Sequence, residues 1–106
     1  MTAPLVPSEL LESVVDYFRP RRVILFGSAA RGEAGPDSDI DLLVILDDDA
    51  PLEKRTLKAG WQARRDYQGA ADVIPVRESI YEVNSRIAGT LSRAAKTEGI
   101  VVYERR

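Results

Sequence analysis

The spacing of apolar residues in the first part of the chain predicts one helix followed by two buried strands. Apolar residues recur at helical spacing behind Ser8, a suitable N-cap, so a first helix is expected to end near Pro20. Residues 22–26 form a β-branched, apolar run that stops at a Gly-Ser turn, and residues 39–46 form the most apolar run in the chain. Both runs are typical of buried strands.

The pattern after residue 50 predicts a second helix and a third strand. Residues 51–67 lack strand character and follow an acidic loop, so they are expected to be helical. The side chains expected to turn inward from this helix are Leu52, Leu57, Trp61 and Tyr67. Residues 71–76 predict a strand, and Pro75 within it indicates the end of the strand or an edge position, because proline cannot donate a backbone hydrogen bond.

The last part of the chain predicts a further helix and a final strand. Apolar residues recur at helical spacing over residues 80–97, with Gly89 as a potential break, and Gly99 fits a helix C-cap. Residues 100–103 then form a short apolar run. Helices and strands alternate throughout, so we expect an α+β fold in which helices pack on a mixed central sheet of about four strands.

Composition narrows the chemistry that such a fold can perform. The 106 residues suffice for a single domain, residues 1–106, and 15 Lys and Arg against 17 Asp and Glu give a net charge of −2. This charge offers no positive field for direct nucleic-acid or membrane binding, and no run approaches the roughly 20 apolar residues of a membrane span. We therefore expect a cytoplasmic protein.

The absence of histidine and cysteine excludes several classes of active site. The chain contains neither residue, which excludes disulfides, thiol nucleophiles, imidazole bases and the usual Cys/His zinc sites. Carboxylates, hydroxyls, lysine and arginine remain. This set of groups is suited to Mg²⁺ and to phosphate.

Two aspartates open the most apolar predicted strand. Asp39 and Asp41 are two residues apart, so the side-chain period of a strand places both carboxylates on one face. Carboxylates held that close repel each other unless a cation lies between them. A lone Asp-x-Asp at a strand start is usually a capped or solvated pair, but here it has a second feature beside it.

That second feature is the Gly27-Ser28 turn after the preceding strand. Glycine allows close approach of the backbone to a ligand, and the following N–H groups with the Ser28 hydroxyl can cradle phosphate oxygens, with Arg31 adding a charged contact. A lone Gly-Ser is usually only a turn. Together with the aspartate pair, it predicts a site for a nucleoside triphosphate and Mg²⁺.

The segment from Gly27-Ser28 to Asp41, with ten residues between Ser28 and Asp39, resembles a known signature. It is similar to the GSx10DxD pattern of the minimal nucleotidyltransferase (MNT) group within the polymerase-beta-like nucleotidyltransferase superfamily. The resemblance extends over most of the chain and implies that superfamily's fold. It implies a third metal-binding and catalytic carboxylate at Asp72, for which a hydrogen-bonded core acid is the alternative. The nucleotide-contacting residues that it implies are Gly27, Ser28, Arg31 and Ser38.

The same resemblance implies a reaction and a partner. Two Mg²⁺ ions, held by Asp39, Asp41 and Asp72, would assist transfer of AMP from ATP to a hydroxyl, with release of pyrophosphate. Chains of this size have no room for an acceptor domain, and they resemble the antitoxins of type VII-like HEPN/MNT toxin–antitoxin pairs. In those pairs the acceptor is a tyrosine of the HEPN ribonuclease toxin.

Two functions from different classes remain open on the sequence alone. The chain is either an active protein adenylyltransferase or a non-catalytic antitoxin that binds the toxin and covers its active site. A basic run within residues 54–65 can touch phosphates or an acidic partner, although a solvated helix face is the simpler interpretation.

Overall fold

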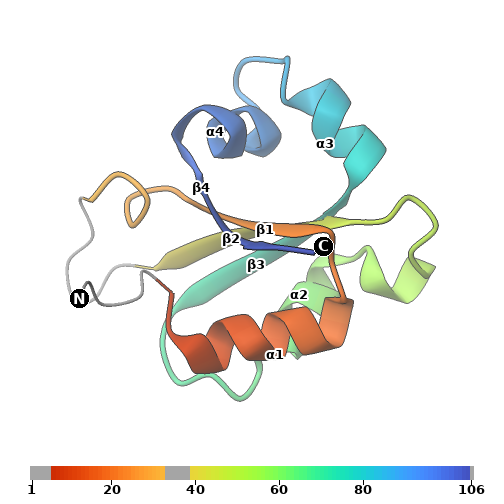
Figure 1. Ribbon diagram of the computed structural model, residues 1–106. Helices are drawn as coiled ribbons and strands as arrows, with labels where there is room; N and C mark the ends of the chain where they lie inside the picture. Colours follow the sequence, from red (N-terminus) through yellow and green to blue (C-terminus); the bar gives the residue numbers. More distant parts are fainter. Residues whose placement is uncertain (1–5, 33–38, 106) are drawn as a thin grey trace.

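Four strands form one mixed sheet, in the order β3-β2-β1-β4 (Figure 1). The computed structural model describes residues 6–32 and 39–105. The strands are β1 (Arg22–Phe26), β2 (Ile40–Leu46), β3 (Ala71–Arg77) and β4 (Ile100–Glu104). β1 runs antiparallel to β2 and β4, whereas β2 and β3 are parallel. The predicted mixed sheet of about four strands is confirmed, and β3, which contains Pro75, lies at an edge as expected.

Helices cover both faces of this sheet (Figure 1). On one face lie α1 (Ser8–Phe18) and α2 (Leu57–Arg64), and on the other lie α3 (Glu78–Asn84) and α4 (Leu91–Glu98). The parallel pair β2–β3 needs a crossover connection, which contains the 3-10 helix η1 (Leu52–Lys54) and α2. The α+β class predicted from the alternation of apolar patterns is therefore the observed one.

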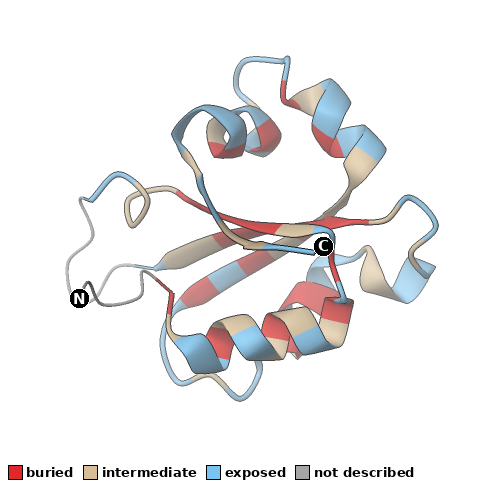
Figure 2. Cartoon of the chain, in the orientation of Figure 1, coloured by how far each residue is buried: buried red, intermediate tan, exposed pale blue. Residues whose placement is uncertain are grey.

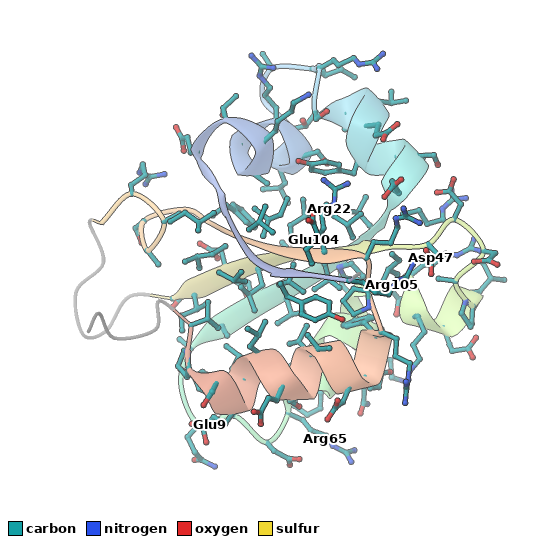
Figure 3. The ribbon with its side chains drawn as sticks, viewed as in Figure 1. Glu9, Arg22, Asp47, Arg65, Glu104 and Arg105 are labelled. Carbon is teal, nitrogen blue, oxygen red and sulfur yellow. The ribbon has the colours of Figure 1, made fainter. Side chains whose placement is uncertain are left out.

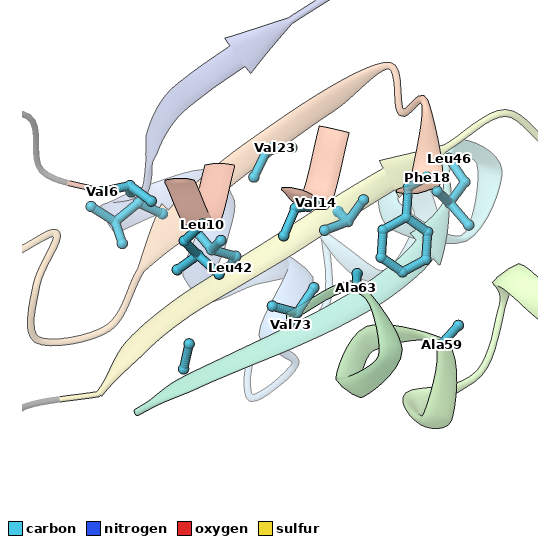
Figure 4. Close-up of a cluster of buried hydrophobic side chains, with 13 residues drawn as sticks. Val6, Leu10, Val14, Phe18, Val23, Leu42, Leu46, Ala59, Ala63 and Val73 are labelled. Atoms are coloured by element: carbon cyan, nitrogen blue, oxygen red, sulfur yellow. The ribbon is translucent and has the colours of Figure 1, made fainter. Parts of the chain in front are cut away.

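Alternating residues of the strands contribute to two hydrophobic clusters, one on each face of the sheet. Figure 2 marks the buried positions along the strands and helices. The first cluster joins Leu10, Val14 and Phe18 of α1 to Leu42 and Val73 of the sheet, and Figure 4 shows these side chains gathered together. The second cluster consists of Ile24, Phe26, Leu43, Ile45, Tyr81 and Ala95. Because β1 and β2 are covered on both faces, they are apolar at nearly every position.

The first helix begins differently from the prediction. Ser8 is its first residue and Pro7 is its N-cap, and the cap side chain makes no hydrogen bond. Proline fixes φ and has no N–H to satisfy, so it suits the helix start without a polar cap. The Ser8 N-cap prediction is wrong by one position.

The helix predicted over residues 51–67 is in fact two shorter elements, η1 and α2. Thr56 interrupts the helix and caps α2 by accepting a hydrogen bond from the Ala59 N–H at 3.0 Å. The inward orientation predicted for Leu52, Leu57 and Trp61 is wrong, since all three are exposed. Small residues are buried instead, and these are Ala59, Gly60 and Ala63.

Gly60 explains why the small face of α2 turns inward. A Cβ at this position would collide with the backbone carbonyl oxygen of Val73 in β3. Because the helix approaches the strand backbone this closely, large apolar side chains of α2 have no room on that side. They project instead beside the outer edge of β3.

The helix predicted over residues 80–97 is likewise divided, into α3 and α4. The chain passes between them through Gly89, whose φ of +89° requires glycine, and Thr90 then caps α4. Gly99 is the C-cap of α4, as predicted. The apolar residues that recurred at helical spacing are largely exposed, namely Ile80, Val83, Ile87 and Leu91. No helix in the described parts of the chain is both long and apolar enough to cross a membrane.

Candidate active site

Two neighbouring strands, β2 and β3, bring the candidate acidic residues to one end of the sheet. Asp41, near the start of β2, pairs in register with Phe26 at the end of β1 and with Asp72 near the start of β3. Residues in register on neighbouring strands point to the same face, so the two carboxylates lie side by side. Asp39 is exposed and directly precedes β2. The fold thus brings Asp39, Asp41 and Asp72 to the same end of the sheet.

Gly27 closes the site on the side of β1. Its φ is +77°, a conformation that L side chains rarely adopt, and a Cβ there would collide with Oδ2 of Asp41. The Arg31 N–H donates to the Gly27 carbonyl oxygen at 3.2 Å, which closes a single turn after the strand. The Gly-Ser pair therefore permits both a sharp turn and direct contact between the backbone and the central carboxylate.

The electrostatics around Asp41 favour a cation. Partial burial raises the pKa of the Asp41 carboxyl, and the negative charges of Asp72 and Asp39 raise it further. Across residues 6–32 and 39–105, no three acidic side chains converge closely enough to hold a metal ion ready-made. The donors nevertheless fit Mg²⁺, since they are hard oxygen ligands and a cation would offset the repulsion between them. Asp41 and its two acidic neighbours are the residues that would hold it.

The candidate nucleotide-binding side chains lie in or near the turn after β1. Ser28 is partly buried in that turn. Nη1 of Arg31 lies 3.2 Å from Oε2 of Glu98 in α4, so its guanidinium is engaged by a carboxylate. Ser38 lies outside the described residues.

A groove that the sequence did not predict lies next to Asp72. It has a volume of about 350 Å³ and runs between α2 and the edge strand β3. Its lining residues are Leu57, Trp61, Arg64, Ala71, Asp72, Val73 and Ile74. The signal in the sequence was the spacing of Leu57 and Trp61, which places both on one helix face. The same spacing equally predicts a core-facing stripe.

A second cavity, of about 410 Å³, lies at the opposite end of the sheet, where β1 begins. Three of its charged side chains are paired with one another: Arg21 with Glu78, and Arg22 with Glu78 at 3.5 Å. Asp47 accepts hydrogen bonds from both guanidinium Nη atoms of Arg105, at 2.8 and 3.0 Å (Figure 3). These ion pairs hold the ends of neighbouring strands together.

The basic run within residues 54–65 also makes local contacts. Nζ of Lys54 lies 3.3 Å from the centroid of the Tyr17 ring, and Arg55 donates to backbone carbonyl oxygens of the preceding loop. Arg64 donates to the carbonyl oxygens of Tyr67 and Gly69. Three of the basic residues therefore stabilise the crossover connection.

Comparison with known structures agrees with the observed fold. A proposed nucleotidyltransferase from Sulfolobus solfataricus is similar over 92% of this chain and 76% of its own, with 23% identity and a TM-score of 0.59. A chain in the crystal structure of a toxin–antitoxin with AMP-PNP is similar over 95% of this chain and 76% of its own, with 18% identity and a TM-score of 0.61. At these identities the likeness concerns the fold. Among curated proteins, no relative matches.

The family comparison covers nearly the whole chain. The sequence model of the nucleotidyltransferase domain matches residues 7–100, a span that includes the turn after β1 and all three candidate aspartates. This chain therefore belongs to the nucleotidyltransferase domain family.

Proposed function

We propose that the chain is a Mg²⁺-dependent nucleotidyltransferase that moves AMP from ATP to a hydroxyl of a partner protein. The observation that carries this proposal is the register of Asp41 with Asp72, directly beside the Gly27 turn. It joins two carboxylates, whose mutual repulsion a cation would offset, to a backbone turn that a phosphate can approach. Membership of the nucleotidyltransferase family supports the same reaction class.

We assign roles in this reaction to the candidate residues that the structure describes. Asp39 and Asp41 would bind the Mg²⁺ that accompanies the triphosphate, and Asp41 with Asp72 would bind a second ion. When bound, such ions offset the negative charge on the attacking and leaving oxygens. The backbone N–H groups after Gly27 and the Ser28 hydroxyl would donate to phosphate oxygens. The Arg31 guanidinium, which pairs with Glu98 through Nη1, would add a charged contact to the same phosphates.

We assign Asp72 to the acceptor side of the site. It is exposed and lies on the edge strand, whereas Asp41 is in the middle of the group. We expect its carboxylate to orient the acceptor hydroxyl and to take its proton as the oxygen bonds to the α-phosphorus of ATP. The bond from that phosphorus to the bridging oxygen breaks, and pyrophosphate leaves.

The proposed partner is a toxin of the HEPN class, with this chain as its antitoxin and one of the toxin's tyrosines as the acceptor. The structural similarity to a toxin–antitoxin with AMP-PNP supports both a toxin partner and an adenine nucleotide. The exposed position of Asp72 is consistent with an acceptor that arrives on another protein.

Transfer of label tests this function directly. The protein is incubated with ATP labelled at the α-phosphate, Mg²⁺ and the product of the adjacent gene. We expect label on a tyrosine of that product, and none with Asp39→Asn or when the label is on the γ-phosphate. Absence of transfer from the folded wild-type protein, in the presence of a complex between the two proteins, would refute the proposal.

A non-catalytic antitoxin is the second candidate. It is favoured by the exposed apolar side chains of Val83 in α3, Ile87 after it and Leu91 in α4, which offer contacts that require no nucleotide. In this case Asp39→Asn/Asp41→Asn would still protect cells from the toxin. Loss of protection by this double variant, with the complex still formed, would exclude a purely steric antitoxin.

A further inference from the structure

A cavity between α3, α4 and the start of β1 is lined mainly by cationic side chains. Its volume is about 410 Å³, within the range of about 300–1,000 Å³ that is typical of small-molecule sites. The lining residues are Arg22, Tyr81, Glu82, Ser85, Arg86 and Lys96. Three cations stand against one carboxylate, although the chain as a whole is slightly acidic. The cavity therefore favours an anionic ligand.

The cations of this cavity still have donors to offer. Among the described residues, the side chains of Arg86 and Lys96 make no hydrogen bond or ion pair, and both residues are exposed. Arg22 donates from one Nη atom to Glu78 at 3.5 Å. Because a guanidinium carries five N–H donors, Arg22 can contact a second anion as well. The cavity thus differs from the one at the start of β1, where the arginines are paired with carboxylates.

The Tyr81 hydroxyl is a further donor, and it lacks a protein partner. Tyr81 is only 6% exposed and belongs to the second hydrophobic cluster, with Cζ of Arg22 5.4 Å from its ring centroid. Its hydroxyl makes no hydrogen bond to any other described residue. Burial raises the pKa of this hydroxyl, so it keeps its proton at neutral pH. Polar groups of buried side chains are normally hydrogen-bonded, and a ligand in the cavity would supply the missing acceptor.

This cavity is separate from the candidate active site. Arg22 begins β1 and Phe26 ends it, next to the Gly27 turn, so the two ends are about 14 Å apart at about 3.4 Å per residue. Arg22 shares a strand face with Ile24 and Phe26 of the second cluster, and Figure 3 shows it on the side of the sheet that α3 and α4 cover. An anion held there is therefore not the triphosphate held at Gly27.

We propose that this cavity binds the phosphate group of a small ligand. Arg86, Lys96 and Arg22 contact the phosphate oxygens, and the Tyr81 hydroxyl donates to one of them. Guanidinium and ammonium groups are well suited to phosphate, and a phosphate of nearly two negative charges matches the excess of cations in the lining. Glu82 can accept a hydrogen bond from a hydroxyl on the ligand, which favours a phosphate monoester over free phosphate. This inference does not depend on AMP transfer.

Calorimetric titration of the full chain tests the site without any measurement of activity. Inorganic phosphate and glycerol 3-phosphate are titrated separately, at an ionic strength held constant with chloride, because salt screens exposed charges. We expect saturable binding of both compounds, with the lower Kd for the ester. Glu82→Ala should remove this difference between the two compounds.

Substitutions locate the bound phosphate. Arg86→Gln and Lys96→Gln should each raise both Kd values about tenfold, because each removes a hydrogen bond from a charged group. Tyr81→Phe keeps the ring in the core and should raise them about threefold, through loss of the hydroxyl donor. Lys58→Gln is the matched control, since Lys58 is an exposed lysine of α2 outside the cavity. Its Kd values should equal those of the wild type, and urea unfolding verifies that each variant is folded.

Other outcomes would overturn the proposal. Phosphate binding that persists in Arg86→Gln/Lys96→Gln but is lost in Ser28→Ala would assign the phosphate to the turn after β1. Equal weakening by Lys58→Gln and Lys96→Gln would show an effect of net charge alone. Absence of saturable binding of either compound to the wild type would also refute the site. Equal Kd values for the two compounds, unchanged in Glu82→Ala, would retain the site and identify free phosphate as its ligand.

Discussion

Replacement of Gly27 by alanine tests the central contact of the candidate site. Gly27 combines a φ of +77° with a position where a Cβ meets Oδ2 of Asp41. The variant therefore adds two costs, backbone strain and displacement of a carboxylate. Gly89→Ala is a matched control, because Gly89 has a φ of +89° and nothing within 4 Å of the added Cβ.

The two costs have different sizes and different consequences. A left-handed conformation at a non-glycine residue costs about 1–2 kcal/mol, and both variants should lose this much of the free energy of unfolding. Only Gly27→Ala must also turn the Asp41 side chain, at a cost of roughly 0.5–1.5 kcal/mol if the rotamer becomes strained. A misplacement of about 1 Å in a reacting group lowers rates about 100-fold, so transfer should fall by that order.

Urea unfolding and AMP transfer, measured on the same preparations, separate these effects. We expect Gly27→Ala to be less stable than Gly89→Ala and to lose transfer, whereas Gly89→Ala keeps the wild-type rate. Wild-type transfer in a folded Gly27→Ala variant would refute the contact between the turn and Asp41 as a requirement for activity. Equal stability of the two variants would show that the Asp41 side chain moves without cost.

Three further substitutions probe the charges and the packing. Asp41→Asn should raise the melting temperature without divalent cations, because it removes repulsion from two neighbouring carboxylates, and should abolish stabilisation by Mg²⁺ with ATP in the same thermal scan. Asp47→Asn should lower the free energy of unfolding by up to about 1 kcal/mol at neutral pH and low salt, because Asp47 loses its ion pairs with Arg105 and Arg21. Urea unfolding measures this difference. Arg105 lowers the pKa of Asp47 in the folded state. The contribution of Asp47 to stability is therefore present above its unfolded pKa and is lost as the pH falls through its folded pKa. The free energies of unfolding of wild type and variant should converge in acid. Gly60→Ala should lower the free energy of unfolding, measured in urea, because its Cβ meets the Val73 backbone. The overpacking costs about 1–3 kcal/mol, and the higher helix propensity of alanine offsets roughly 1 kcal/mol of this.

The strands were predictable from the sequence because their signal is local and strong. The runs at residues 22–26 and 39–46 are apolar at almost every position, as expected for strands covered on both faces. The faces of the helices were not predictable in the same way. The apolar spacing of Leu57 and Trp61 is genuine, but the helix packs through Ala59 and Ala63.

The buried face of α2 depends on how closely the helix approaches the sheet, and the periodicity of apolar residues does not report that distance. Where a helix lies directly against a strand backbone, small residues make the contact, and large apolar residues are left for other surfaces. The small residues Ala59 and Ala63, one helical turn apart, were the signal in the sequence for the buried face of α2.

Strand periodicity predicted Asp41 within β2, Asp39 directly precedes that strand, and the resemblance pointed to Asp72. The register that brings Asp41 beside Asp72 could not be obtained from the sequence, because it depends on how the crossover connection docks. The pairing of Arg31 with Glu98 was also missed. That contact joins residues remote in sequence through the placement of α4.

The parallel pairing of β2 with β3 has a consequence for the order of folding. The turn at Gly27 and Asp41 belong to neighbouring antiparallel strands, whereas Asp72 joins them only after the chain has passed through η1 and α2. Closing that longer loop carries an entropic cost that the docking of α2 against β3 must offset. Contacts between residues remote in sequence form slowly in general. A nascent chain that has completed β2 therefore carries two of the three acidic residues, and the full group exists only when the crossover has closed.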